Sequence, residues 1–141
     1  LAAEDPDAPI DLYLSSPGGW VSSAFTIVEA VQRVEPPVNI HAIGICYSSC
    51  AMILVAATGE RTASDSTLLM LHANLGDSDE PYSYERIARD RYENVWKAYS
   101  AIPDDWYPMN RDEAYYLTSE EALEFGIIDT VVVPKDQAPP G

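Results

Sequence analysis

The feature of this sequence that most constrains its fold is a repeated pattern of a short apolar strand, a glycine-containing turn and an apolar helix. The first unit runs from a strand at Ile10–Leu14 through Pro17-Gly18-Gly19 into the amphipathic segment Val21–Val34. The second runs from a strand at Asn39–Ile45 into the small and apolar segment Ala51–Ala57. Such alternation is typical of a parallel sheet with helices on its faces, in which active residues gather where strands end. The pattern therefore predicts an α/β fold.

A serine stands at the junction between the second strand and its helix. Gly44 breaks the strand and Ser48 lies just before Ala51, so the Ser48 hydroxyl is expected to point outward from the turn. Backbone N–H groups at the start of the helix could hold a developing oxyanion. A serine at a helix start is, however, more often an N-cap than a nucleophile. This motif alone leaves both interpretations open.

A histidine follows the next apolar strand and raises the case for a nucleophile. His72 comes directly after Leu68-Leu69-Met70-Leu71. Two adjacent strands could bring Ser48 and His72 together as the donor–base pair that acyl transfer needs. The alternative is a histidine satisfied by backbone groups at a strand end. His41 lies within the preceding strand and receives only that structural interpretation.

The glycine pair of the first unit is a second candidate element of a site. Gly18 and Gly19 follow Pro17 and permit a conformation in which backbone N–H groups converge on an incoming carbonyl oxygen. The alternative is an ordinary turn, because Pro-Gly is one of the commonest turn dipeptides.

Composition and charge exclude several functional classes. The chain has 8 Lys and Arg against 23 Asp and Glu, and its net charge of -15 disfavours nucleic acids and anionic lipid surfaces. No apolar run approaches the ~20 residues that span a bilayer. Cys46 and Cys50 lack the spacing of zinc ligands, so we expect both to be small buried side chains. Two unpaired cysteines fit a reducing compartment. No metal or organic cofactor is expected. The length of 141 residues and 47% hydrophobic content predict one domain.

Taken in order, these motifs and several others resemble the Clp protease proteolytic subunit, ClpP, of the ClpP/crotonase fold. The likeness extends from Asp11 to Val133. The matching segments are Leu12-Tyr13-Leu14-Ser15-Ser16-Pro17-Gly18-Gly19, Gly44 through Ala51, Gly59-Glu60-Arg61, Met70-Leu71-His72 and Glu121 through Asp129. Each motif alone is weak, but the ordered set at matching spacing is specific.

The resemblance implies a serine endopeptidase that cleaves unfolded polypeptides through an acyl-enzyme. Ser48 would be the nucleophile, favoured over its neighbour Ser49 by the motif spacing, and His72 the base. The oxyanion hole would use the N–H groups of Gly19 and Ser49, with that of Gly18 as a further candidate. The family further implies two stacked seven-membered rings of one or several subunit types, an AAA+ unfoldase partner, and a cytoplasmic or organelle-matrix location.

The resemblance also implies a crotonase-like fold of repeated β-β-α units over residues 1–133. The Pro-rich composition of residues 134–141 predicts a disordered tail. The helix Tyr84–Ser100 would be the handle by which two rings interlock. The segments Ala73–Pro81 and Ile102–Asp112 are expected to be loops. Thr118-Ser119-Glu120-Glu121 is a capping box that opens a short helix ended by Gly126, and a strand is expected at Ile127–Val133.

One departure from the family pattern bears on activity. The position of the expected triad aspartate falls on Ala114, with Asp112 and Glu113 as neighbours. A shift of one residue along a strand would turn a side chain to the opposite face, so neither neighbour is a simple replacement. Two alternatives therefore stay open beside the protease: a catalytically silent ring subunit and, less favoured, an enzyme of the crotonase fold that handles acyl-CoA.

Overall fold

The computed structural model describes residues 5, 7–72, 80–106 and 113–135 of the chain. The expected loops Ala73–Pro81 and Ile102–Asp112, and the tail Pro134–Gly141, lie partly outside these residues. The strands are β1 (Ile10–Ser16), β2 (Val38–Tyr47), β3 (Arg61–Ser64), β4 (Leu68–His72), β5 (Ala114–Leu117) and β6 (Thr130–Val132). The helices are α1 (Val21–Arg33), α2 (Ser49–Val55), α3 (Tyr84–Tyr99) and α5 (Ser119–Glu124).

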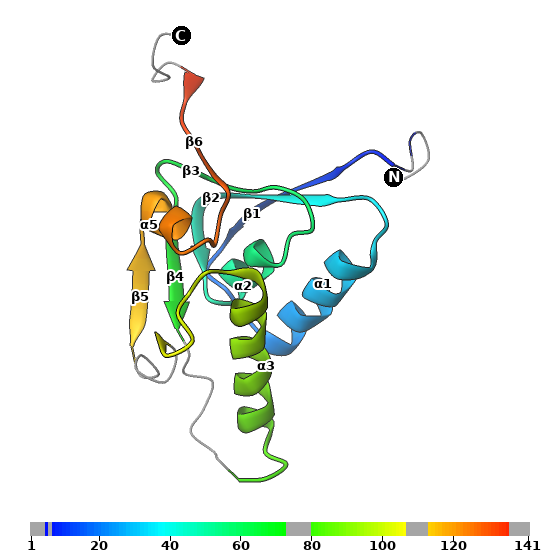
Figure 1. The fold of residues 1–141 in the computed structure, drawn as a ribbon, viewed down its shortest axis with the longest axis vertical. Coiled ribbons are helices and arrows are strands. Elements are labelled where there is room, and N and C mark those ends of the chain that lie inside the picture. Colours follow the sequence, from blue (N-terminus) through cyan, green and yellow to red (C-terminus); the bar gives the residue numbers. More distant parts are fainter. Residues whose placement is uncertain (1–4, 6, 73–79, 107–112, 136–141) are drawn as a thin grey trace.

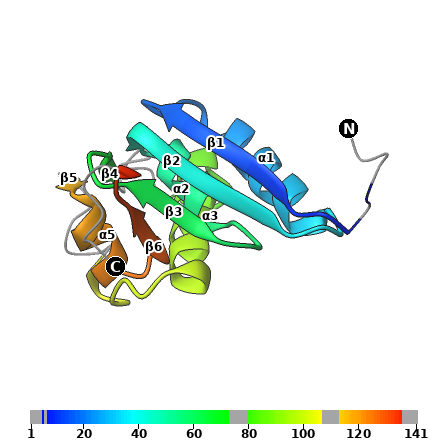
Figure 2. The ribbon, with the colours of Figure 1, turned by 90° about the horizontal axis from the view of Figure 1, so that it is seen from above.

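The long strand β2 is the centre of a 6-stranded sheet, because it pairs with three other strands. It runs parallel to β1, parallel to β3 over its first half, and parallel to β4 over its last residues. Strand β6 adds to β3 in parallel, whereas β5 adds to β4 in the antiparallel sense. Figure 2 shows β1, β2 and β3 side by side. The predicted α/β fold with a mainly parallel sheet is confirmed.

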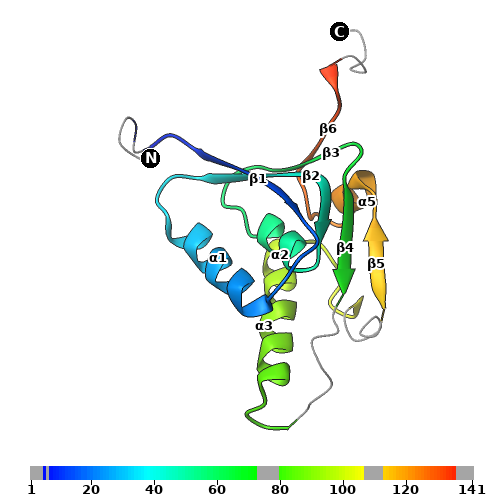
Figure 3. The ribbon, with the colours of Figure 1, turned by 180° about the vertical axis from the view of Figure 1, so that it is seen from behind.

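Helices α1, α2 and α3 lie together on one side of β1, β2 and β3 (Figures 1 and 3). The other face of these three strands exposes apolar side chains such as Tyr13 and Ile43. Helix α2 is the centre of the core, because every one of its residues is buried. Its small and apolar composition fits a helix that is surrounded by protein on all sides.

Most predicted elements are found, with ends that move by a few residues. Thr118 caps α5 through the predicted capping box, and Gly126 adopts the positive φ of 64° that ends this region of helix. The last strand is shorter than expected, because the N–H groups of Ile127 and Ile128 donate to the Ala122 carbonyl and not to a neighbouring strand. Strands β3 and β5 were not predicted, since each has only 4 residues and a short segment carries little periodicity.

Helix α3 is the predicted long helix, and one end of it extends beyond the rest of the molecule (Figure 1). Ser83 caps its first turn by accepting a hydrogen bond from the Arg86 N–H. Tyr92 and Trp96 are fully buried, whereas Ile87 is 43% exposed and lines a cavity with Phe25 of α1. The apolar side chains of α3 therefore cover a wider arc of the helix than the part that packs against the core.

Arg61 and Asp129, which belong to two of the matched motifs, hold the fold together away from Ser48. The Arg61 guanidinium bonds both carboxylate oxygens of Asp129 and donates to the carbonyls of Tyr99 and Gly126 at 2.7 and 2.9 Å. It thereby joins β3, the end of α3 and the turn before β6. The arginine keeps the pKa of Asp129 below its usual value, chiefly through the side-chain hydrogen bond.

Candidate active site

Ser48 occupies the sharp junction where β2 ends and α2 begins. Its φ of 55° and ψ of -118° are rare for a residue with a side chain. Its N–H donates to the Met70 carbonyl at 2.7 Å, and its carbonyl accepts from the Met52 N–H at 3.1 Å. Strained backbone of this kind persists only where surrounding contacts fix it, and it clusters at functional sites.

The Ser48 side chain faces His72 rather than its own helix. Although Ser48 is the N-cap residue of α2, its side chain makes no capping hydrogen bond within the described chain. Its Oγ lies 2.7 Å from His72 Nε2. The neighbouring hydroxyl of Ser49 donates instead to the Gly19 carbonyl at 3.1 Å. Of the two serines, Ser48 therefore has the geometry of a nucleophile beside its base.

His72 reaches Ser48 because β2 and β4 are parallel neighbours. Tyr47 and Met70 are register partners, so the two strands end at the same edge of the sheet. The side chain of Tyr92 on α3 packs near this end of β4, and its hydroxyl lies beside the His72 backbone. Complete burial raises the pKa of Tyr92, so its phenol stays neutral. The sequence predicted that Tyr92 belongs to the apolar stripe of its helix, but it did not predict the contact with His72.

The glycine turn after β1 packs directly against the serine segment. Gly18 has a φ of 99°, and a Cβ added to it would lie 2.9 Å from the Tyr47 carbonyl oxygen and 3.1 Å from Ser48 Cβ. Only glycine fits this approach. The Gly18 N–H donates to Ser16 Oγ at 3.1 Å, so it is engaged within its own turn. The donors that stay candidates for an oxyanion are the N–H groups of Gly19 and Ser49.

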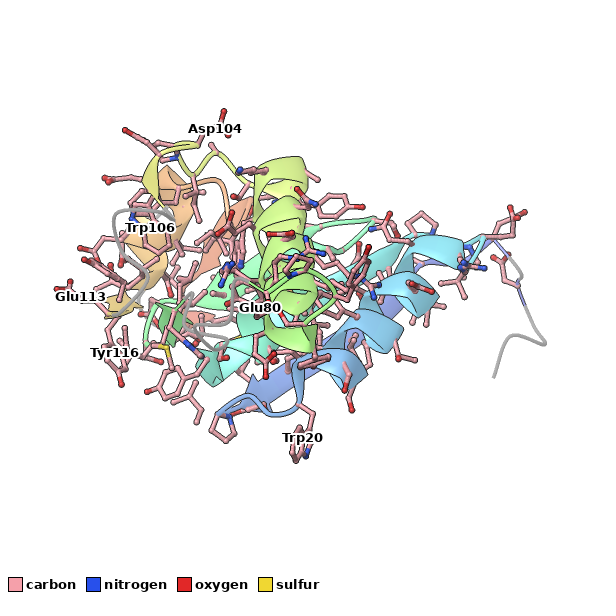
Figure 4. The ribbon with its side chains drawn as sticks, turned by 90° about the horizontal axis from the view of Figure 1, so that it is seen from below. Trp20, Glu80, Asp104, Trp106, Glu113 and Tyr116 are labelled. Carbon is pink, nitrogen blue, oxygen red and sulfur yellow. The ribbon has the colours of Figure 1, made fainter. Side chains whose placement is uncertain are left out.

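Two cavities adjoin this glycine turn, and Trp20 lines both of them. One, of about 300 Å³, lies against Tyr84 and Ala88, and the other, of about 270 Å³, lies against Ser49 and Cys50. Trp20 is 82% exposed and projects away from the body at the start of α1 (Figure 4). Space for apolar side chains of a ligand therefore exists beside the Ser48 segment.

Strand β5 settles where Ala114 and Glu113 lie relative to the histidine. Ala114 is the register partner of His72, so its methyl group lies on the His72 face of the sheet. The Glu113 carboxylate accepts a hydrogen bond of 2.5 Å from the Tyr115 hydroxyl, which raises the pKa of Tyr115. Figure 4 shows Glu113 at the outer edge of the molecule. Asp112, the other proposed replacement, lies outside the described residues.

The second histidine is held by two side chains, and not by the backbone groups that were expected. His41 lies on β2 with Nδ1 2.8 Å from Thr62 Oγ1 and Nε2 3.1 Å from Asp11 Oδ1. Hydrogen bonds from Asn39 and His41 lower the pKa of Asp11. No group of three potential metal ligands occurs among the residues that the structure describes. Over the same residues, none of the helices has the length and apolar character needed to span a membrane.

Fold and site together define a class: a mixed α/β protein with a serine–histidine pair at the ends of two parallel strands, an arrangement suited to acyl transfer. The chain belongs to the Clp protease family, whose model matches residues 1–135. The resemblance that the motifs indicated is thereby confirmed. By family, the protein is a ClpP-like protease subunit, and the family consists of hydrolases that act in proteolysis.

Proposed function

We propose that this protein is a serine endopeptidase that cleaves unfolded polypeptides through an acyl-enzyme. The observation that carries the proposal is the 2.7 Å contact between Ser48 Oγ and His72 Nε2. In the proposed reaction Ser48 Oγ attacks the peptide carbonyl while His72 accepts its proton. His72 then gives that proton to the leaving amine, and a water molecule activated in the same way releases the acyl group.

The proposed oxyanion hole is formed by the N–H groups of Gly19 and Ser49. Ser49 is the first residue of α2, so its N–H has no carbonyl partner within the helix. The hydrogen bond from Ser49 Oγ to the Gly19 carbonyl holds the two segments in a fixed relation. Fixed donors aimed at a developing charge are typically worth about 3–4 kcal/mol each in acyl transfer.

The proposal includes assembly, because the Clp protease family generally forms rings that work with AAA+ unfoldases. We propose two stacked seven-membered rings joined through α3, whose exposed side chains include Tyr84 at 59% and Ile87 at 43%. An ATP-dependent unfoldase would then deliver extended chains to Ser48. Aromatic and aliphatic groups on one exposed helix face are typical of a buried subunit interface.

A fluorophosphonate probe tests the nucleophile. We expect the folded protein to form one adduct, located on Ser48 by mass spectrometry, and Ser48→Ala to form none. Ser49→Ala is the matched control: it should still form the adduct on Ser48, at a lower rate because the hydrogen bond that ties Ser49 to the Gly19 carbonyl is lost. Labelling at Ser49 instead, or equal labelling of Ser48→Ala, would contradict the assignment.

A second candidate function, a catalytically silent ring subunit, is favoured by the register of β5. Opposite His72 this strand carries Ala114, so the expected triad position supplies a methyl group and not a carboxylate. In serine proteases the triad carboxylate orients the histidine and stabilises its imidazolium, and its loss lowers turnover by roughly 10⁴-fold. A subunit of this kind would keep the fold and the contact surfaces and would pair with an active relative.

Ala114→Asp separates the two candidates. Because Ala114 shares a face with His72, the new carboxylate is expected to raise the rate of Ser48 labelling by roughly tenfold or more. Ala114→Asn is the isosteric control and should give no comparable gain. Strong labelling of the unchanged protein supports the protease, whereas labelling that requires Ala114→Asp supports the silent subunit.

A further inference from the structure

Trp20 is a large aromatic residue that neither the core nor the helix after it explains. Its side chain is 82% exposed, whereas Trp96 is fully buried. Trp20 is the N-cap residue of α1, where Ser, Thr, Asp or Asn would stabilise the helix, and its side chain makes no capping hydrogen bond within the described chain. Its backbone is fixed, because its carbonyl accepts from the Ala24 N–H at 3.1 Å. An exposed indole on a fixed backbone is suited to packing against a ligand.

The glycine before Trp20 has an open side. Among the described residues, a Cβ added to Gly19 would meet no atom within 4 Å apart from its chain neighbours, whereas Gly18 packs against Ser48. The Gly19 carbonyl accepts from Ser49 Oγ at 3.1 Å, so the turn is held in place. Trp20 follows Gly19 directly, and consecutive Cα atoms are about 3.8 Å apart. A side chain next to a carbonyl bound by the Gly19 N–H is therefore within reach of the Trp20 ring.

The cavity of about 300 Å³ beside this turn lies between two helices. Trp20 and Val21 line it from the start of α1, and Tyr84 and Ala88 line it from α3. Ala88 contributes only a methyl group to this lining. None of the described residues that line the cavity is charged. The cavity therefore suits a large apolar side chain, whereas a carboxylate would lose its hydration there without gaining a partner.

We propose that Trp20 is a specificity-determining residue that selects substrates with an aromatic or large aliphatic side chain beside the scissile bond. That side chain enters the cavity and packs on the Trp20 ring while its carbonyl is held by the Gly19 N–H. Acidic side chains are disfavoured by the uncharged lining and by the net charge of -15. The inference rests on the proposed function, because it uses the proposed oxyanion donor.

Peptide binding tests the inference without turnover. The assay uses Ser48→Ala protein and fluorescein-labelled extended peptides whose central residue is Phe, Leu, Ala or Glu, and fluorescence anisotropy gives each Kd. We expect the Phe and Leu peptides to bind roughly tenfold or more tightly than the Ala peptide, and the Glu peptide to bind most weakly. Trp20→Ala should reduce the preference for Phe over Ala by roughly 2- to 10-fold, the range of an aromatic pair, and Trp20→Phe should retain it. Tyr84 also belongs to the proposed seam between rings, so the variants are made at Trp20.

Tyr13→Ala is the matched control, because Tyr13 is 65% exposed on the opposite sheet face and lines a different cavity with His41. It should leave the peptide preference unchanged. Ala88→Leu adds volume to the lining and should weaken binding of the Phe peptide more than that of the Ala peptide. Equal binding of the Phe and Ala peptides, no binding of any peptide, or a preference that survives Trp20→Ala would overturn the inference.

Failure of the proposed function has a different signature. If a fluorophosphonate labels Ser48 while the peptides show no preference, the protease proposal stands and Trp20 does not determine specificity. If Ser48 never labels but Trp20→Ala removes a measured preference, the chain binds apolar peptides without cleaving them. The inference about Trp20 then stands while the protease proposal fails.

Discussion

At the scale of single residues, the site depends on contacts that the positions of the residues in the sequence do not reveal. Ser48 could have been an ordinary N-cap from its position alone, yet its hydroxyl contacts His72. Gly18 could have been an ordinary turn glycine, yet its Cα lies against the Ser48 segment. In both cases the chemistry follows from what the residue touches and not from its residue type.

Gly18→Ala should damage the site, because the added Cβ meets the Tyr47 carbonyl at 2.9 Å and Ser48 Cβ at 3.1 Å. We expect the rate of Ser48 labelling to fall roughly 10- to 100-fold, the usual cost of a misplaced reacting group. Gly44→Ala is the matched control. Gly44 also has a positive φ, of 74°, but its nearest contact is the Ser15 hydroxyl at 3.4 Å. Equal losses in both variants would mean that backbone strain, and not the clash with Ser48, sets the effect.

At the scale of elements, the molecule is held by ties between segments that lie far apart in the chain. Arg61 joins β3 to the end of α3 and to the turn before β6 through the carbonyls of Tyr99 and Gly126. Charged donors that satisfy such carbonyls contribute about 1.5–3 kcal/mol each to stability. Arg61 and Asp129 therefore stabilise the fold, which explains their place in the matched motifs.

The ion pair predicts a specific dependence of stability on pH. Because Arg61 lowers the pKa of Asp129 below 3.8, the pair stabilises the fold at pH values above 3.8, and this contribution is lost as the pH falls through the lowered pKa. Asp129→Asn should therefore be less stable than the unchanged protein at pH 6, and the gap should narrow below about pH 4. Thermal melts followed by circular dichroism at each pH measure this difference in stability. Asp90→Asn, at an exposed pair with Arg86, should show no such gap.

At the scale of the whole molecule, the chain leaves apolar surface that its own core does not use. Helix α3 exposes Tyr84 and Ile87, and the sheet face opposite the helices exposes Tyr13 and Ile43. A face of this kind is stable in water when another subunit covers it. The family supplies the same expectation, since Clp proteases generally assemble as rings.

Light scattering after gel filtration tests assembly through α3. We expect a particle much heavier than the 15.5 kDa chain. Ile87→Glu should shift it to smaller species, because a charge would be buried at the seam. Leu123→Glu is the control, since Leu123 on α5 is also 43% exposed. A particle size that is insensitive to Ile87→Glu, or equally sensitive to Leu123→Glu, would argue against α3 as the seam.

The sequence by itself determined the strand–turn–helix units, the capping box at Thr118 and the position of Ser48 and His72 at neighbouring strand ends. These follow from local periodicity and turn chemistry, which neighbouring residues encode. Only the tertiary structure decided that the Ser48 hydroxyl faces His72, that the Gly18 N–H is engaged by Ser16, and that β5 runs antiparallel with Ala114 opposite His72. Such features depend on contacts between residues distant in the chain, and no local pattern specifies them.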